Sequence, residues 1–234
     1  MQPQNQYQFG ASTAGGKVIT TDAHKVLRNT YMLLAMTLLF SSAMTGVSMA
    51  LGVPFGMGFV ASLVALALLW FVMPRTANSS AGLVTVFAIT GLLGFGLGPT
   101  ITHYLNFANG SQIVMLALGI TGVAFAGLSG YALISRRDFS FMRNFLMVGV
   151  LIAFVAMIIA IVASFVGYPM PALMLTISAM FAFLMCGMIL WQTGEIVNGG
   201  ETNYVMATIG LYVSIYNLFT SLLHLLGAFM GERD

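Results

Sequence analysis

Seven long apolar stretches, separated by short polar breaks, limit what this chain can fold into more than any other feature of its sequence. They fall at 29–50, 54–73, 82–103, 112–134, 145–166, 170–191 and 205–229. An apolar helix of about 20 residues crosses the hydrocarbon core of a bilayer, and no charged residue lies deep inside any of these stretches. Only 6% of the 234 residues are charged, against about 25% in an ordinary soluble domain. The sequence therefore predicts an all-α integral membrane protein with seven transmembrane helices.

The segment before the first span is polar but carries almost no charge. Residues 1–22, MQPQNQYQFGASTAGGKVITTD, are rich in Gln, Asn, Gly, Ser and Thr, a composition typical of disorder. The segment has neither the basic start nor the immediate apolar run of a cleaved signal peptide. We expect a disordered N-terminal tail over 1–22 and a single seven-helix domain over 23–234.

The basic residues set the expected orientation of the bundle. If the chain crosses seven times, seven of the eight basic residues fall on one side of the membrane: Lys17, Lys25, Arg28, Arg75, Arg136, Arg137 and Arg143. The other side receives Arg233 alone. Because short loops rich in Lys and Arg stay in the cytoplasm, we predict a cytoplasmic N-terminus and a C-terminus on the outer side.

The last span carries small and polar residues along one face. They recur at spacings of four, three, four and three, which places them on one side of a helix: Gly210, Ser214, Asn217, Ser221 and His224. A polar side chain without a partner is unfavourable in hydrocarbon. We therefore expect this polar seam to face other helices or a small aqueous cavity, with the last helix inside the bundle. Two interpretations stay open: polar packing between helices, or a proton or cation path.

Glycines are frequent inside the spans. Gly94 and Gly98 form a GxxxG pattern in the third span, and the fourth and sixth spans carry Gly119, Gly122, Gly127, Gly130 and Gly187. Small residues let membrane helices approach closely, so we expect tight helix packing at these positions.

The sequence contains no motif of a soluble enzyme. HExxH, Walker and GxSxG patterns are absent, as are Cys or His clusters. No pair of aspartates lies inside a span, as an intramembrane protease would need. We therefore expect a protein that is not an enzyme and holds no cofactor or metal. The net charge of +2 gives no indication of nucleic acid as a partner.

Four stretches of the sequence agree in order with one known family. They read HKVLRNTYMLLAMTLLFSSA, AITGLLGFGLGP, ALISRRDFSFM and GGETNYVMATIGLYVSIYNLFTSLLHLLG. They resemble the Bax inhibitor-1 (transmembrane Bax inhibitor motif) family, and most of all its bacterial YccA-like branch, from about residue 23 to 230. The resemblance implies a bacterial inner-membrane protein with a periplasmic C-terminus. It also implies a last helix that lies centrally and is wrapped by the other six.

The resemblance implies two different functions. YccA-like proteins bind the membrane-anchored AAA+ zinc metalloprotease FtsH, as its substrates and its modulators, whereas other family members are pH-sensitive calcium leak channels. In the channels a pair of aspartates is central, and this chain has Gln192 and Ser214 at those positions, neither of which titrates. Glu195, three residues after Gln192, is the acid that could substitute. We predict a modulator of an FtsH-type protease, with a calcium, cation or proton leak as the alternative.

Overall fold

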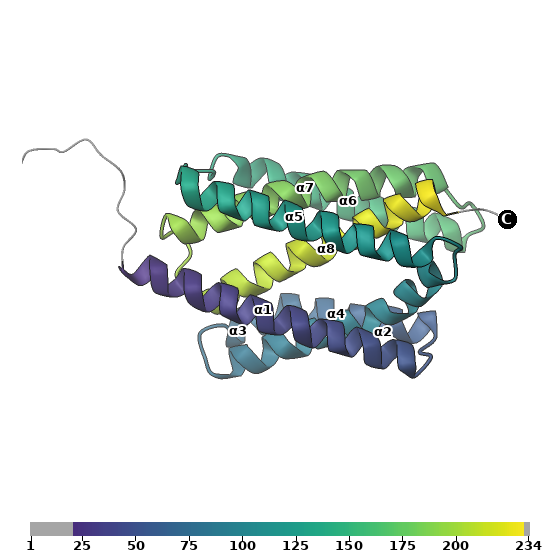
Figure 1. Ribbon diagram of the computed structural model, residues 1–234, viewed down its shortest axis with the longest axis horizontal. Helices are drawn as coiled ribbons and strands as arrows, with labels where there is room; N and C mark the ends of the chain where they lie inside the picture. The colour runs from purple at the N-terminus through teal and green to yellow at the C-terminus, as the bar shows by residue number, and fades with distance from the viewer. Residues whose placement is uncertain (1–20, 232–234) are drawn as a thin grey trace, which may run out of the picture.

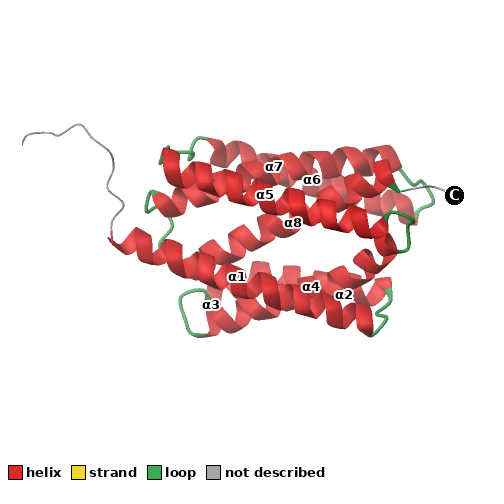
Figure 2. Cartoon of the chain, in the orientation of Figure 1, coloured by secondary structure: helices red, strands yellow, loops and turns green. Residues whose placement is uncertain are grey.

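The computed structural model describes residues 21–231, and every regular element in this range is a helix (Figure 2). The elements are α1 (Thr21–Ala50), α2 (Phe55–Ala67), η1 (Leu68–Val72), α3 (Met73–Thr76), α4 (Ala81–Leu105), α5 (Gly110–Ser135), α6 (Met142–Phe165), α7 (Pro171–Val197) and α8 (Tyr204–Met230). Within the described residues, seven helical runs are long and apolar enough to cross a membrane, the second being α2, η1 and α3 together. The predicted seven-span, all-α architecture is confirmed. The tail predicted over 1–22 lies outside the described residues except for positions 21 and 22, which begin α1.

The helices form two groups with α8 between them (Figure 1). On one side α1 and α2 pack against α4, and on the other α5 and α6 pack against α7. The last helix crosses obliquely between the groups and contacts α1, α4, α5 and α7. Within the described chain, the backbones of α2 and α6 make no close approach to α8. The predicted central position of the last helix is therefore confirmed, with four of the six other spans in close backbone contact with it.

The second span continues as one helix through a proline. Pro74 has no N–H group, so it cannot bond the carbonyl of Trp70 one turn earlier. The helix widens just before this point into the π-helical segment η1, where the N–H of Met73 bonds the carbonyl of Leu68. Such single π turns are a common way to absorb a local defect in the hydrogen-bond ladder.

Glycines on α4 bring α1 and α4 into close contact. A Cβ atom added at Gly94 would collide with the carbonyl oxygen of Ser41, and one at Gly98 would collide with the Ser48 hydroxyl. The hydroxyl of Thr45 also donates to the Gly94 carbonyl at 2.8 Å. The packing role expected for the GxxxG pattern is confirmed.

The glycines of α5 behave differently from those of α4. A Cβ atom added at Gly119, Gly122, Gly127 or Gly130 would meet no other atom of the described chain within 4 Å. The prediction of tight packing at these positions is therefore wrong. These glycines face open space, because the close neighbours of α5 lie on its other sides.

These two sets of glycines give a paired test of packing. We expect Gly94→Ala to lower the stability of the bundle by about 1–3 kcal/mol, as overpacking does. Gly119→Ala is the matched control and should leave stability unchanged or slightly raised, since alanine favours the helix more than glycine does. Thermal unfolding in detergent measures both. Equal stability of the two variants would contradict close packing of α1 on α4.

Candidate functional site

The polar seam of α8 lies against α7 over much of its length. Ser214 is only 1% exposed, and its hydroxyl lies 3.1 Å from both the Gln192 side-chain oxygen and the Gly210 carbonyl. The Gln192 amide also covers Gly210, where an added Cβ would lie 3.2 Å from the amide nitrogen. Gln192 and Ser214 are thus hydrogen-bonded to each other.

The far part of the seam makes a second contact with α7. His224 is half-buried, and its Nδ1 lies 2.7 Å from the hydroxyl of Ser178. Asn217 donates to the Val213 carbonyl at 2.8 Å, within its own helix. Ser221 is buried. The seam therefore reaches α7 at two separate places.

Apolar side chains occupy the surface of α7 between these two contacts. Phe181, Met185 and Ile189 belong to the hydrophobic core, and their spacing from Ser178 and Gln192 places all five on one face of α7. The contacts at Ser214 and His224 are 10 residues apart in the sequence, roughly 15 Å along a helix axis. The polar contacts between α7 and α8 therefore fall in two separate pairs, with apolar side chains of α7 between them.

A cavity of about 350 Å³ lies where α6, α7 and the start of α8 meet. Its lining includes Gln192, Glu195, Gly210, Glu201 and Arg143. It thus joins three of the seven candidate residues, whereas Ser214, Asn217, Ser221 and His224 are not part of its lining.

Glu195 has a protein partner at the edge of this cavity. Its carboxylate accepts a hydrogen bond from the indole N–H of Trp191 at 3.1 Å. The guanidinium of Arg143 lies 5.8 Å from the centre of the same indole, close enough for a cation–π interaction. In the described part of the chain, no three His, Cys, Asp or Glu side chains gather as metal ligands would. Glu195 therefore takes part in an aromatic and charged cluster with Trp191 and Arg143.

A second polar face of α8 points toward α1 and α4, and sequence reasoning missed it. The hydroxyl of Tyr212 lies 2.6 Å from the Ser41 hydroxyl on α1 and 3.2 Å from the Thr90 carbonyl on α4. Thr208 and Tyr216 likewise reach backbone carbonyls of α1 and α4. Their spacing of four was a detectable signal, because it places these three residues on one side of the helix.

The start of α8 is held by Asn203. The Asn203 side-chain oxygen accepts from the N–H groups of Val205 and Met206, at 2.9 and 3.2 Å, which caps the helix. Its amide nitrogen donates to the Ala77 carbonyl at 3.0 Å and to the Asn78 side chain at 2.7 Å. A single side chain therefore joins the start of α8 to the connection between α3 and α4.

The SRRDF stretch after α5 forms a similar brace against α7. Arg136 ends α5 in the left-handed conformation, with φ of 50°. Phe139 is buried and packs where Gly194 leaves room on α7. Asn198 donates to the Arg137 carbonyl at 3.2 Å. Both motif-bearing connections thus fix the same end of the bundle.

The fold and these contacts define a class: a polytopic α-helical membrane protein whose last helix is held centrally by polar contacts. A family model described as "Inhibitor of apoptosis-promoting Bax1" matches residues 23–231. The chain belongs to this Bax inhibitor family, as its motifs predicted.

Relatives match over nearly the whole chain. A Vibrio cholerae protein named only as an uncharacterized membrane protein is 48% identical over 215 residues, covering 92% of this chain and 94% of that one. The "Modulator of FtsH protease YccA" of Escherichia coli strain K12 is 42% identical over 223 residues, covering 95% and 98% of the two chains. The matching protein of E. coli strain O6:H1, with the same identity and coverage, is named "Inner membrane protein YccA". The predicted similarity to the YccA-like branch is confirmed.

The clamp at Asn203 can be tested directly. Asn203→Ala removes a helix cap, which typically costs about 1 kcal/mol and up to about 2, together with two bonds to the connection before α4. Asn106→Ala is the matched control, because Asn106 is exposed at the end of α4. Thermal unfolding in detergent should show a lower midpoint for the first variant only. Similar midpoints for both would contradict the clamp.

Proposed function

We propose that the protein binds an FtsH-type AAA+ protease in the bacterial inner membrane, modulates its degradation of other membrane proteins, and is itself a substrate. The observation that carries this proposal is the 42% identity to a protein named as a modulator of that protease, over 95% and 98% of the two chains. Similarity of this extent covers all seven spans and their connections. The proposal gives the protein no catalytic role of its own.

The distribution of charge supports a cytoplasmic N-terminus. The start of α1, the connection after α3 and the connection between α5 and α6 lie at one end of the bundle (Figure 1). These segments, together with α3 and the first turn of α6 that adjoin them, carry six basic residues: Lys25, Arg28, Arg75, Arg136, Arg137 and Arg143. By the positive-inside rule this end faces the cytoplasm, where the ATP-driven part of such a protease works.

The N-terminal segment is our candidate for the protease's point of attachment. An ATP-driven protease must grip a flexible end before it can pull, and residues 1–20 are rich in Gln, Asn, Gly, Ser and Thr. Behind this segment, extraction of α1 would break its contacts with α4 and α8, including the Ser41–Tyr212 bond. A bundle that resists extraction occupies the protease and thereby slows the decay of its other substrates.

The half-life of a membrane substrate of the protease tests this proposal. We expect the full chain, expressed in cells, to slow decay of that substrate relative to cells without it. A version lacking residues 1–20 should slow decay more strongly if the protease pulls on that segment. A third version, with 1–20 replaced by a Gly/Ser segment of equal length, separates the need for a flexible end from the need for this sequence. Unchanged decay in all three, with each protein shown to be inserted, would overturn modulation.

A calcium, cation or proton leak is the second candidate function, because polar side chains recur along α8. The geometry gives it less support. Gln192 and Ser214 are hydrogen-bonded to each other, and neither side chain can titrate. On α7, apolar side chains separate this pair from the contact between Ser178 and His224: Phe181, Met185 and Ile189.

Ion flux in vesicles that contain this protein alone tests the second candidate. We expect no flux above empty vesicles for protons or calcium between pH 5 and 8, and no change on Ser214→Ala, Glu195→Gln or His224→Ala. In cells, Ser214→Ala should leave protease modulation intact, because it removes one polar helix contact of about 0.6 kcal/mol. Ion flux that changes when these side chains are substituted would contradict our expectation and support the leak function.

A further inference from the structure

A seam between α1 and α5 runs along one side of the bundle. The two helices belong to different groups, with α8 visible between them (Figure 1), and no close backbone approach joins them in the described chain. The rings of Tyr31 on α1 and Phe125 on α5, with centroids 5.9 Å apart, bridge the space. One cavity lies on each side of this bridge, and we call the whole feature the α1–α5 seam.

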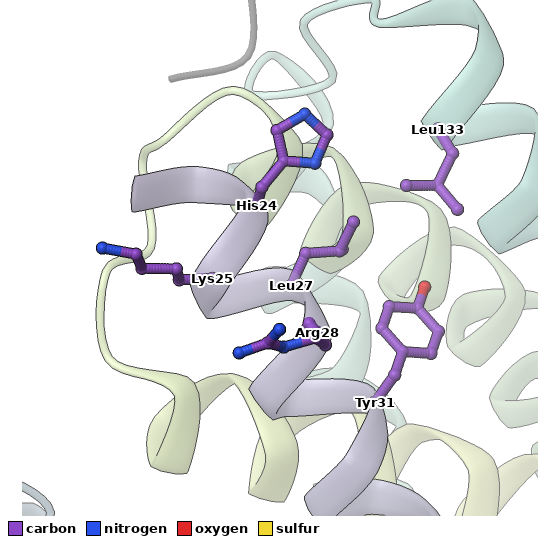
Figure 3. A pocket seen from close by; sticks show the side chains of 6 residues that line it. All are labelled: His24, Lys25, Leu27, Arg28, Tyr31 and Leu133. Carbon is purple, nitrogen blue, oxygen red and sulfur yellow. The ribbon is translucent and has the colours of Figure 1, made fainter. Parts of the chain in front are cut away.

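The first cavity lies at the end of the seam that carries basic residues. It has a volume of about 510 Å³ and is lined by His24, Lys25, Leu27, Arg28, Tyr31 and Leu133 (Figure 3). Leu27 and Tyr31 lie on the side of α1 toward Leu133, while the charged ends of Lys25 and Arg28 extend away from Leu133 on the outer side of α1 (Figure 3). The mouth of the seam is therefore basic and its wall is apolar.

Two further observations indicate that this mouth suits an anion. The Tyr31 hydroxyl is shielded from solvent and has no hydrogen-bond partner among the described residues, so it is available as a donor. Arg136 and Arg137 follow the end of α5 at the same end of the bundle. Asp138, which follows these two arginines, accepts from the Ser140 N–H.

The second cavity lies deeper along the seam and is mostly apolar. It has a volume of about 340 Å³, and its lining includes Leu38, Thr45, Leu118, Gly122, Ile215 and Phe219. Because Gly122 has no side chain and faces open space, the α5 side of the cavity is open at this point. From Arg28 to Leu38 the seam runs about 15 Å along α1, from the membrane surface into the hydrocarbon.

We propose that the α1–α5 seam binds one anionic phospholipid. Lys25 and Arg28, which line the first cavity on the outer side of α1, supply the positive charge for the phosphate, and the Tyr31 hydroxyl is a further donor on the side toward Leu133. Guanidinium and ammonium groups bind phosphate through charge-assisted hydrogen bonds, and basic pockets between membrane helices take anionic head groups. An acyl chain then passes Leu27, Tyr31 and Leu133 and lies in the cavity beside Gly122. This inference does not depend on the proposed protease partner.

Native mass spectrometry tests the head-group part of the proposal. The full chain is released from vesicles of equal phosphatidylglycerol and phosphatidylcholine, and the retained lipid is identified. We expect the wild type to retain phosphatidylglycerol, and Lys25→Gln/Arg28→Gln to lose that preference by about tenfold or more, since each basic residue contributes substantially to anionic-lipid binding. Arg75→Gln/Arg143→Gln is the matched control, because it removes the same charge from the same end of the bundle outside the seam. Equal loss in both double variants would overturn the proposal.

Fluorescence quenching tests the acyl-chain part. A tryptophan is introduced by Leu133→Trp after Trp70 and Trp191 are changed to Phe, and the vesicles carry lipids brominated on the acyl chain. Brominated phosphatidylglycerol should quench more strongly than brominated phosphatidylcholine, and Gly122→Leu, which fills the deeper cavity without changing charge, should reduce the difference.

Three outcomes of the quenching experiment would overturn the proposal. Equal quenching by the two lipids would reduce the seam to ordinary lipid contact. Full competition by soluble glycerol phosphate would reveal a phosphate site with no role for the chain. Quenching that disappears whenever a membrane protein partner is added, whatever the lipid charge, would identify the seam as a docking site for a helix.

Discussion

Polar side chains on a buried membrane helix must find partners inside the protein, because hydrocarbon offers none. The two helix groups of this protein are held together under that constraint. On one side of α8, Ser214 and His224 bond side chains of α7, and on the other, Tyr212 bonds α1 and α4 at once. Contacts on opposite faces fix the rotation of α8 about its axis. Since both groups pack on α8, that rotation sets how they sit relative to each other.

The spans and the central last helix were predictable from the sequence, because apolar length and the spacing of polar residues depend on the helix alone. The sequence did not predict which neighbouring helix each face of the last helix would contact. Spacing placed Ser214 and His224 on one face, but only the packed structure shows that Phe181 and Ile189 of α7 separate their partners. The contacts of Tyr212 were not predicted, because the sequence alone does not show which group the hydroxyl of an otherwise apolar tyrosine will bind. The glycines of α5 show the same limit, since a small residue permits close approach without supplying the second helix.

The family motifs take on a structural meaning in this bundle. The ETN stretch contributes Asn203, which ties the start of α8 to the connection before α4. SRRDF contributes Phe139 and the Arg137 carbonyl, which tie the start of α6 to the end of α7. Both motifs brace the basic end of the bundle, where α1 also begins. A partner that binds at this end would meet connections that are already hydrogen-bonded to the bundle. Between α1 and α5, in contrast, no close backbone contact is present in the described chain.

The position of α8 in the chain bears on how the protein is made. Chains fold from the N-terminus as they are synthesised, and α8 follows the other six spans. The helix that joins the two groups is thus the last to enter the membrane. Until it arrives, Ser41, Thr90 and Gln192 lack the partners that α8 brings. The contacts of α8 that join the two helix groups can therefore form only after the rest of the bundle has been synthesised.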